Sequence, residues 1–170
     1  LAVACSTVDL PRNKLPDVET AERKRDAAAE KLARLRKENA PYPEVRTAEC
    51  DWFGAEKAHT LAKAAASGEL EQEYGKYTPA EVMVVRIGAC CIVTLPGELY
   101  VEYSLEIKEK TACKTYVVCL ANGSTGGYIV TPEAKEKGGY EAWNALFEPS
   151  AGDVLVNEAV RLVEKLCCQG

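Results

Sequence analysis

The stretch EVMVVRIGACCIVTL, residues 81–95, decides the fold class because it predicts two β-strands joined by a tight turn. Residues 81–87 and 90–95 are rich in β-branched side chains, and Gly88-Ala89 between them permits the turn. We expect the two segments to form a hairpin, with the second strand more fully buried than the first. The chain therefore contains a β-sheet, although most of its other segments predict helices.

The segments on either side of the hairpin predict helices and one further strand. Along the chain we expect an irregular segment over 1–16, a helix from its N-cap Asp17 to about Asn39, a helix over about 55–66, a helix from about Gly97 to Lys110, a strand over 115–121, a short helix from Thr131-Pro132 to Gly138-Gly139, and a helix from Ser150. This order predicts an α/β fold in which helices pack on a small mixed β-sheet.

Length and composition place the chain among globular proteins. We expect a single domain over residues 1–170, mostly helical over 1–78 and α/β over 79–170. The sequence is 47% apolar and 28% charged, which suits a soluble core. A net charge of -5 gives no basic surface for nucleic acid. No apolar run approaches the ~18 residues of a transmembrane segment.

Cysteine and histidine set limits on metal chemistry. The chain has eight cysteines, at positions 5, 50, 90, 91, 113, 119, 167 and 168. None form a C-x-x-C pair. Cys90, Cys91 and Cys119 lie inside apolar runs, which favours buried, reduced thiols, although disulfides stay open. The single histidine, His59, lies in an Ala-rich helical stretch and predicts a surface or packing role. Because catalytic zinc usually takes several His or Cys ligands, the chain alone cannot complete such a site.

Two loops follow predicted strands at positions where α/β proteins bind ligands. The first is Pro96-Gly97-Glu98 and the second is Asn122–Tyr128. If the helix between them is a crossover, both loops open on the same edge of the sheet, and Glu98 and Tyr128 can face one pocket. For Glu98 an ordinary alternative stays open. A carboxylate in the first turn of a helix is stabilised by the helix dipole by about 0.3–1 kcal/mol.

Several short motifs in this half of the chain resemble a known enzyme family. They are Leu95-Pro-Gly-Glu98, Val118-Cys-Leu-Ala-Asn-Gly123, Tyr128-Ile-Val-Thr131 followed by Pro132-Glu133, and Gly139-Tyr-Glu141. Their order over residues ~80–145 resembles the later part of the neutral/alkaline non-lysosomal ceramidase family, above all its short, microbial-type members. The loop before Tyr128 is one residue longer than is usual there, and Gly139 stands where the ceramidases proper have arginine.

The resemblance implies a metal site shared with another part of the protein. Family members are zinc amide hydrolases whose metal is held by two histidines from the earlier part of the chain, a glutamate and a tyrosine. By this similarity Glu98 and Tyr128 are the last two zinc ligands. Tyr140, twelve residues after Tyr128, is the group that binds the substrate carbonyl as charge develops on it.

The resemblance therefore implies that this chain is the C-terminal portion of a zinc-dependent amide hydrolase and is inactive alone. Its α/β fold is then part of a larger split domain. Its substrate is a small N-acyl amide, and a lipid is one candidate. Its partner is the N-terminal part of the same protein, which supplies the histidines that zinc requires. The alternative is a non-catalytic α/β binding or structural module, or an inactive relative, which the missing histidines and Gly139 favour.

Two further expectations concern surface and compartment. We expect exposed apolar surface where the missing part belongs, which a homo-oligomer can cover. Cysteine usage favours a cytoplasmic location, whereas the family resemblance favours a secreted one.

Overall fold

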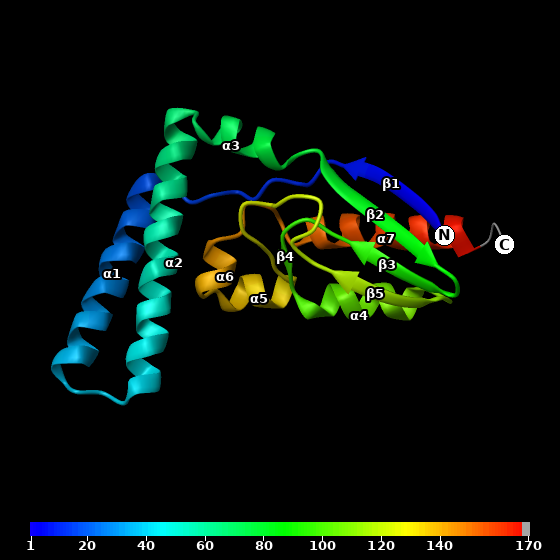
Figure 1. Ribbon diagram of the computed structural model, residues 1–170. Coiled ribbons are helices and arrows are strands. Elements are labelled where there is room, and N and C mark those ends of the chain that lie inside the picture. The colour runs from blue at the N-terminus through cyan, green and yellow to red at the C-terminus, as the bar shows by residue number, and fades with distance from the viewer. Residues whose placement is uncertain (168–170) are drawn as a thin grey trace. The chain divides into compact units, whose positions relative to one another are not determined.

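The chain has an α/β fold in which helices pack on a small mixed sheet (Figure 1). A computed structural model describes residues 1–167. The elements follow in the order β1 (Ala2–Val8), α1 (Val18–Lys37), α2 (Tyr42–Ser67), α3 (Leu70–Tyr77), β2 (Ala80–Ile87), β3 (Cys90–Thr94), β4 (Glu98–Leu99), α4 (Val101–Lys110), β5 (Lys114–Val118), β6 (Tyr128–Ile129), α5 (Pro132–Lys137), α6 (Tyr140–Trp143) and α7 (Ser150–Cys167). The predicted fold class is confirmed.

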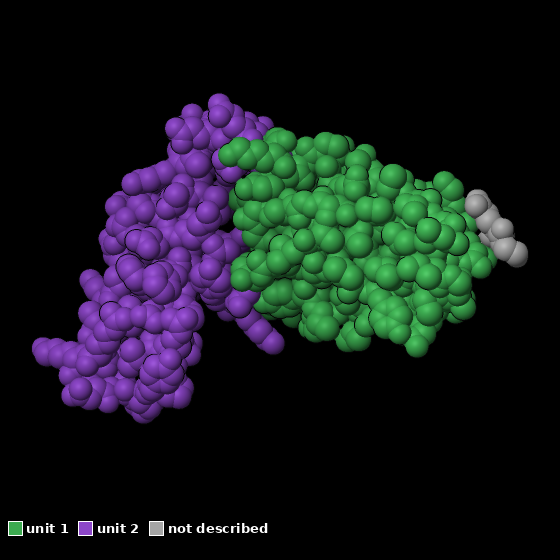
Figure 2. Space-filling view, in the orientation of Figure 1, with its two compact units in different colours: residues 1–13, 75–136, 145–170 green, residues 14–74, 137–144 purple. Residues whose placement is uncertain are grey.

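The elements belong to two compact units, which Figure 2 distinguishes by colour. The first unit comprises residues 1–13, 75–136 and 145 onwards, and it contains the sheet. The second unit comprises residues 14–74 and 137–144, and it is helical. Both units are therefore assembled from segments that are distant in the sequence.

The sheet of the first unit has the strand order β1-β2-β3-β5. Strands β2 and β3 form the predicted antiparallel hairpin, with Val85 opposite Ile92. Strand β5 pairs parallel to β3 after the crossover helix α4, as expected for a mixed sheet. Strand β1 pairs antiparallel to β2 and lies at the edge of the sheet.

Helices α7 and α4 cover one face of this sheet. Helix α7 packs on β1, β2 and β3, and α4 packs on β5 and on α7. Alternate strand residues point into this layer, as the two-residue period of a strand requires. The fully buried side chains of this core are Val82, Val84, Val93, Ile107, Leu155, Val156, Leu162 and Val163.

The opposite face of the sheet carries apolar side chains that remain accessible. One row of paired residues crosses all four strands, and it consists of Val3, Val85, Ile92 and Tyr116. At the two edges Val3 is 56% exposed and Tyr116 is 47% exposed. Apolar side chains are thus exposed at both edges of this face.

The second unit is built around helices α1 and α2, which pack against each other, and α6 packs on α2. The predicted cap is confirmed, because the Asp17 carboxylate accepts a hydrogen bond of 2.8 Å from the backbone N–H of Thr20. Gly54 lies at the α2–α6 contact, where an added Cβ would be 2.8 Å from the Trp143 ring. The Lys24 ammonium sits 4.0 Å from the centre of that ring.

Several predicted boundaries are wrong for identifiable reasons. Residues 1–16 were expected to be irregular, but β1 forms there because β2 supplies a pairing partner. Helix α2 begins at Tyr42 rather than near Ala55, since Pro43 lies in the first turn, where proline is tolerated. The last helix agrees with its predicted start at Ser150.

Cysteine chemistry differs from the favoured expectation. Cys113 and Cys167 form a disulfide. Of the free cysteines that the structure describes, Cys91 alone is buried, whereas Cys5 is exposed. Cys168 lies outside the described residues. No helix in the described part of the chain is long and apolar enough to cross a membrane.

Candidate functional site

The Pro-Gly-Glu corner after β3 is fixed by a close contact with the loop before β6. Gly97 has φ +80°, a conformation that L side chains rarely adopt. A Cβ built on Gly97 would lie 2.0 Å from the Oγ1 atom of Thr125, so this position has room only for glycine. Thr125 is fully buried, and its hydroxyl donates a hydrogen bond of 2.8 Å to the Gly127 carbonyl. The two loops therefore form one packed structure.

Backbone hydrogen bonds join the same two segments just beyond strands β3 and β5. The Leu95 N–H donates to the Val118 carbonyl at 2.9 Å, and the Ala121 N–H donates back to the Leu95 carbonyl at 3.1 Å. The Leu120 N–H donates to the Gly97 carbonyl at 3.0 Å. The prediction that both loops leave the sheet at one edge is confirmed by these bonds and by the parallel pairing of the strands.

Asn122 and Gly126 hold the second loop in shape. Asn122 has φ 65°, and its side-chain amide donates to the Thr94 hydroxyl at 2.6 Å. Gly126 has φ +69°, and an added Cβ would lie 2.4 Å from the ring of Tyr77. The loop is thus anchored to β3 at one end and packed against an aromatic ring at the other.

Glu98 and Tyr128 lie side by side at the end of these loops. Strands β4 and β6 pair in parallel, with Glu98 opposite Tyr128 and Leu99 opposite Ile129. Paired residues of neighbouring strands project to the same side and have backbones about 4.8 Å apart. Ile129 is fully buried, whereas Glu98 is exposed and Tyr128 is half-buried. The Glu98 and Tyr128 side chains therefore leave the ladder together on its accessible side.

The ordinary alternative for Glu98 is wrong. Helix α4 begins at Val101 with Tyr100 as its N-cap, so Glu98 precedes the helix and belongs to β4. The acidic residue in the first turn of α4 is Glu102. The Tyr100 N–H donates to the Ile129 carbonyl at 3.1 Å, and this bond extends the ladder as far as the helix start. Interaction with the helix dipole therefore does not explain why residue 98 is a glutamate.

Tyr140 lies in the other unit, at the start of α6. It is 36% exposed and lines a hollow of about 550 Å³ together with Arg46, Cys50, Phe53, Lys57 and Asn144. Its neighbour Gly139 has φ +100° with no atom close to an added Cβ. The third predicted site residue is thus accessible, but it belongs to a different compact unit from Glu98 and Tyr128.

The single histidine, His59, is packed inside the protein. His59 is buried within the helical unit, and its Nδ1 atom lies 2.9 Å from Nη1 of Arg25. Because a guanidinium can only donate, Nδ1 is the acceptor and the ring proton is on Nε2. That Nε2 atom is buried with no hydrogen-bond partner among the described residues. The prediction of a packing role for His59 agrees with this burial.

The sequence suggested the candidate ligands Glu98 and Tyr128, but it did not reveal the backbone structure that holds them. The two-residue strands β4 and β6 are too short to carry a period, so the ladder that aligns Glu98 with Tyr128 is visible only in three dimensions. Gly97 and Thr125, whose contact fixes the loops, carry no signal beyond the glycine itself. No protein-family model matches this chain, and no curated protein is detectably similar to it.

Proposed function

We propose that the chain is the C-terminal portion of a zinc-dependent amide hydrolase resembling the neutral ceramidases, with Glu98 and Tyr128 as two of its zinc ligands. The observation that carries the proposal is their pairing in the β4–β6 ladder, which places a carboxylate and a phenol next to each other. The ordered motifs of residues ~80–145 support the same assignment. Tyr140 is proposed to donate a hydrogen bond to the oxyanion of the substrate.

The donor set fits part of a zinc site. Carboxylate oxygen is a common zinc ligand, and a catalytic site needs three protein ligands or more. Glu98 and Tyr128 supply two oxygen donors, so the proposed partner is the N-terminal part of the same protein, with two histidines. When bound, zinc would polarise the scissile carbonyl and lower the pKa of a bound water.

The residues around the ladder support a positioning role. Metal ligands work best when backbone contacts hold them rigidly before the metal arrives. Here the Gly97–Thr125 contact and the Asn122–Thr94 hydrogen bond fix the segments that carry Glu98 and Tyr128. The ladder therefore presents both side chains without a large ordering cost on binding.

The test uses the full-length parent protein, in which zinc content and acyl-amide hydrolysis are measured together. In oxidising buffer, where Cys113 and Cys167 stay bridged, Glu98→Gln and Tyr128→Phe should each lower bound zinc and activity about tenfold or more. Glu102→Gln and Tyr116→Phe are matched controls, because they change an acid and a tyrosine elsewhere in the same unit. Zinc content that is unchanged in both site variants would overturn the ligand assignment.

One observation favours the alternative, a non-catalytic α/β binding or structural module. The only histidine of the chain is buried and bonded to Arg25, so this chain offers no histidine for catalysis. The coding sequence upstream of Leu1 separates the two proposals. Two histidine motifs encoded there support the hydrolase, whereas an upstream sequence without such motifs supports the module.

A further inference from the structure

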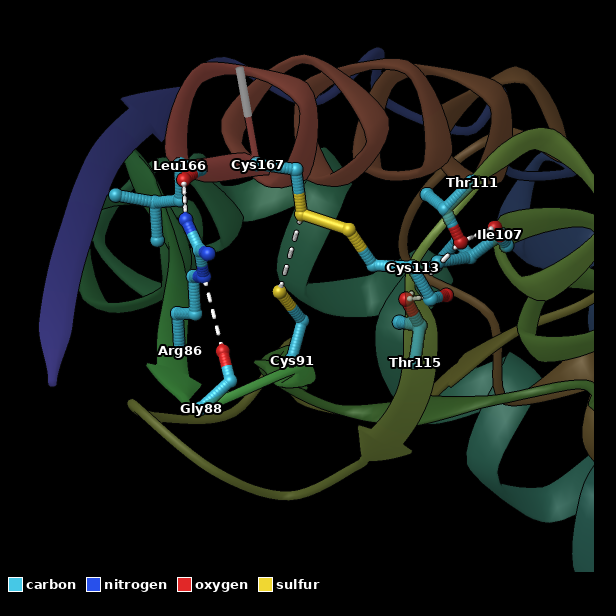
Figure 3. Close-up of a disulfide and its surroundings, with 9 residues drawn as sticks. All are labelled: Arg86, Gly88, Cys91, Ile107, Thr111, Cys113, Thr115, Leu166 and Cys167. Carbon is cyan, nitrogen blue, oxygen red and sulfur yellow. Dashed lines mark hydrogen bonds between the residues drawn. A yellow bond between two sulfur atoms is a disulfide. The ribbon is translucent and has the colours of Figure 1, made fainter. Parts of the chain in front are cut away.

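Three cysteine side chains from different elements converge where the end of α7 meets the sheet. Cys91 lies on β3, Cys113 lies in the turn before β5, and Cys167 is the last residue of α7 (Figure 3). Their Sγ atoms all lie within 4.8 Å of one another. Cys113 and Cys167 are joined as a disulfide, and the Sγ of Cys91 is 3.8 Å from that of Cys167. The three sulfur atoms are thus close enough together to contact one metal ion.

We propose that the reduced chain binds one Zn²⁺ ion through Cys91, Cys113 and Cys167. A small thiol can reduce the disulfide. Two RSH molecules convert it to two cysteine thiols and leave as the oxidised disulfide RSSR. Zinc then displaces one proton from each of the three thiols as the Zn–S bonds form. This site shares no residue with the Glu98–Tyr128 pair, so it stands independently of the proposed function.

One of the three sulfur–sulfur distances matches the dimensions of a zinc–thiolate site. Zinc binds thiolates at about 2.3 Å in a tetrahedron, which sets neighbouring sulfurs about 3.8 Å apart. The Cys91–Cys167 separation already has this value. The Cα atoms of Cys113 and Cys167 are 7.0 Å apart, just beyond the usual range of about 4.4–6.8 Å for bridged cysteines. Once the bridge is reduced, side-chain rotation alone can move these two sulfurs apart to the same spacing.

Arg86 balances the charge of such a site. Three thiolates and Zn²⁺ carry a net charge of -1, and Arg86 lies beside Cys91 in the β2–β3 ladder. Its guanidinium is held in place because Nη1 donates to the Leu166 carbonyl at 2.5 Å and Nε donates to the Gly88 carbonyl at 3.0 Å (Figure 3). Burial raises the pKa of the Cys91 thiol, and the Arg86 charge opposes this rise. A metal ion in the cluster would favour the thiolate further.

The experiment titrates the reduced, metal-free 170-residue chain with Co²⁺ under anaerobic conditions and then adds Zn²⁺. Cobalt reports thiolate ligation through intense sulfur-to-metal charge-transfer absorption. We expect one Co²⁺ per chain, displaced by one Zn²⁺. Cys91→Ser, Cys113→Ser and Cys167→Ser should each weaken binding at least tenfold. The matched controls Cys5→Ser and Cys119→Ser should bind as the parent chain does.

Alkylation keeps the proposal testable if a serine variant fails to fold. In the parent chain Zn²⁺ should protect Cys91, Cys113 and Cys167 from iodoacetamide, as peptide mass spectrometry can measure. Protection of these three residues, with Cys5 and Cys119 still reactive, supports the site. Absence of charge-transfer absorption in the parent chain, unchanged binding in all three site variants, or protection of other cysteines instead would overturn it.

Discussion

Glu98 and Tyr128 occupy directly opposite positions of the parallel β4–β6 ladder, although 30 residues separate them in the sequence. The pairing depends on two loops that leave parallel strands and interlock through Gly97 and Thr125. The relative position of the two side chains is therefore a property of backbone structure. Substitutions that disturb the loops should disturb the pair even when neither residue is changed.

The Gly97–Thr125 contact predicts a large cost for any side chain at position 97. Gly97→Ala should lower the free energy of unfolding by about 3 kcal/mol, because it combines a positive φ with a 2.0 Å clash. Gly88→Ala is the matched control, since Gly88 also has a positive φ of +61° but open space around it. The control should cost only about 1 kcal/mol. Urea denaturation of both variants measures the difference, and equal costs would contradict the packing argument.

Asn122 combines an unusual backbone conformation with a hydrogen bond, and two substitutions separate these contributions. Asn122→Gly keeps the positive φ of 65° but loses the bond to Thr94, and should cost about 1 kcal/mol. Asn122→Ala loses the bond and is strained at positive φ, and should cost about 2–3 kcal/mol. Urea denaturation again provides the measurement. A glycine variant less stable than the alanine variant would contradict this account.

The fold class could be predicted because its determinants are local. The β-branched segments of the hairpin and the crossover from β3 to β5 are visible as alternating composition and spacing. Strand β1 could not be predicted, since its seven residues form a strand only with β2 as a partner. Helix α2 was predicted too short because prolines 41 and 43 resemble a break, yet they open the helix.

The sequence predicted that Glu98 and Tyr128 lie at one edge of the sheet, but it could not predict how they are arranged there. The loops of Glu98 and Tyr128 were assigned to one sheet edge from strand order alone, and the structure places the two residues in register. The helix expected from Gly97 starts at Val101, because the backbone at 98–99 pairs with β6 instead. The Cys91, Cys113 and Cys167 cluster left no sequence signal, since its members are 22 and 54 residues apart.

Tyr103 makes stability depend on pH in the alkaline range. Its hydroxyl is buried and lies 2.8 Å from the Val130 carbonyl and 2.9 Å from the Pro149 carbonyl. Burial, with smaller effects from Asp153 and other nearby acids, raises the pKa of Tyr103 from 10.0 to about 12. The unfolded chain therefore releases this proton first as the pH rises, so its contribution to stability is complete below pH 10 and is lost between pH 10 and 12.

Tyr103→Phe tests that assignment. The variant should lose about 1–3 kcal/mol at pH 7, because two buried carbonyls lose their hydroxyl partner. The difference from the parent chain should then shrink as the pH rises past 10. Tyr116→Phe, on the exposed face of the sheet, should match the parent at every pH. Urea unfolding at several pH values provides the comparison, and a constant difference for Tyr103→Phe would contradict the raised pKa.

The disulfide ties the end of α7 to the segment before β5, and its effect should be large in the oxidised chain. Cys113 and Cys167 are 54 residues apart, and closing a loop of that size restricts the unfolded chain by about 4 kcal/mol. Cys113→Ser should lower the free energy of unfolding by about this amount in metal-free, oxidising buffer, whereas Cys119→Ser should leave it nearly unchanged. A strong reductant should remove most of the difference between Cys113→Ser and the parent chain, because both then lack the bridge. A difference of the same size in reducing, metal-free buffer would show that Cys113 stabilises the fold by packing and not through the bridge.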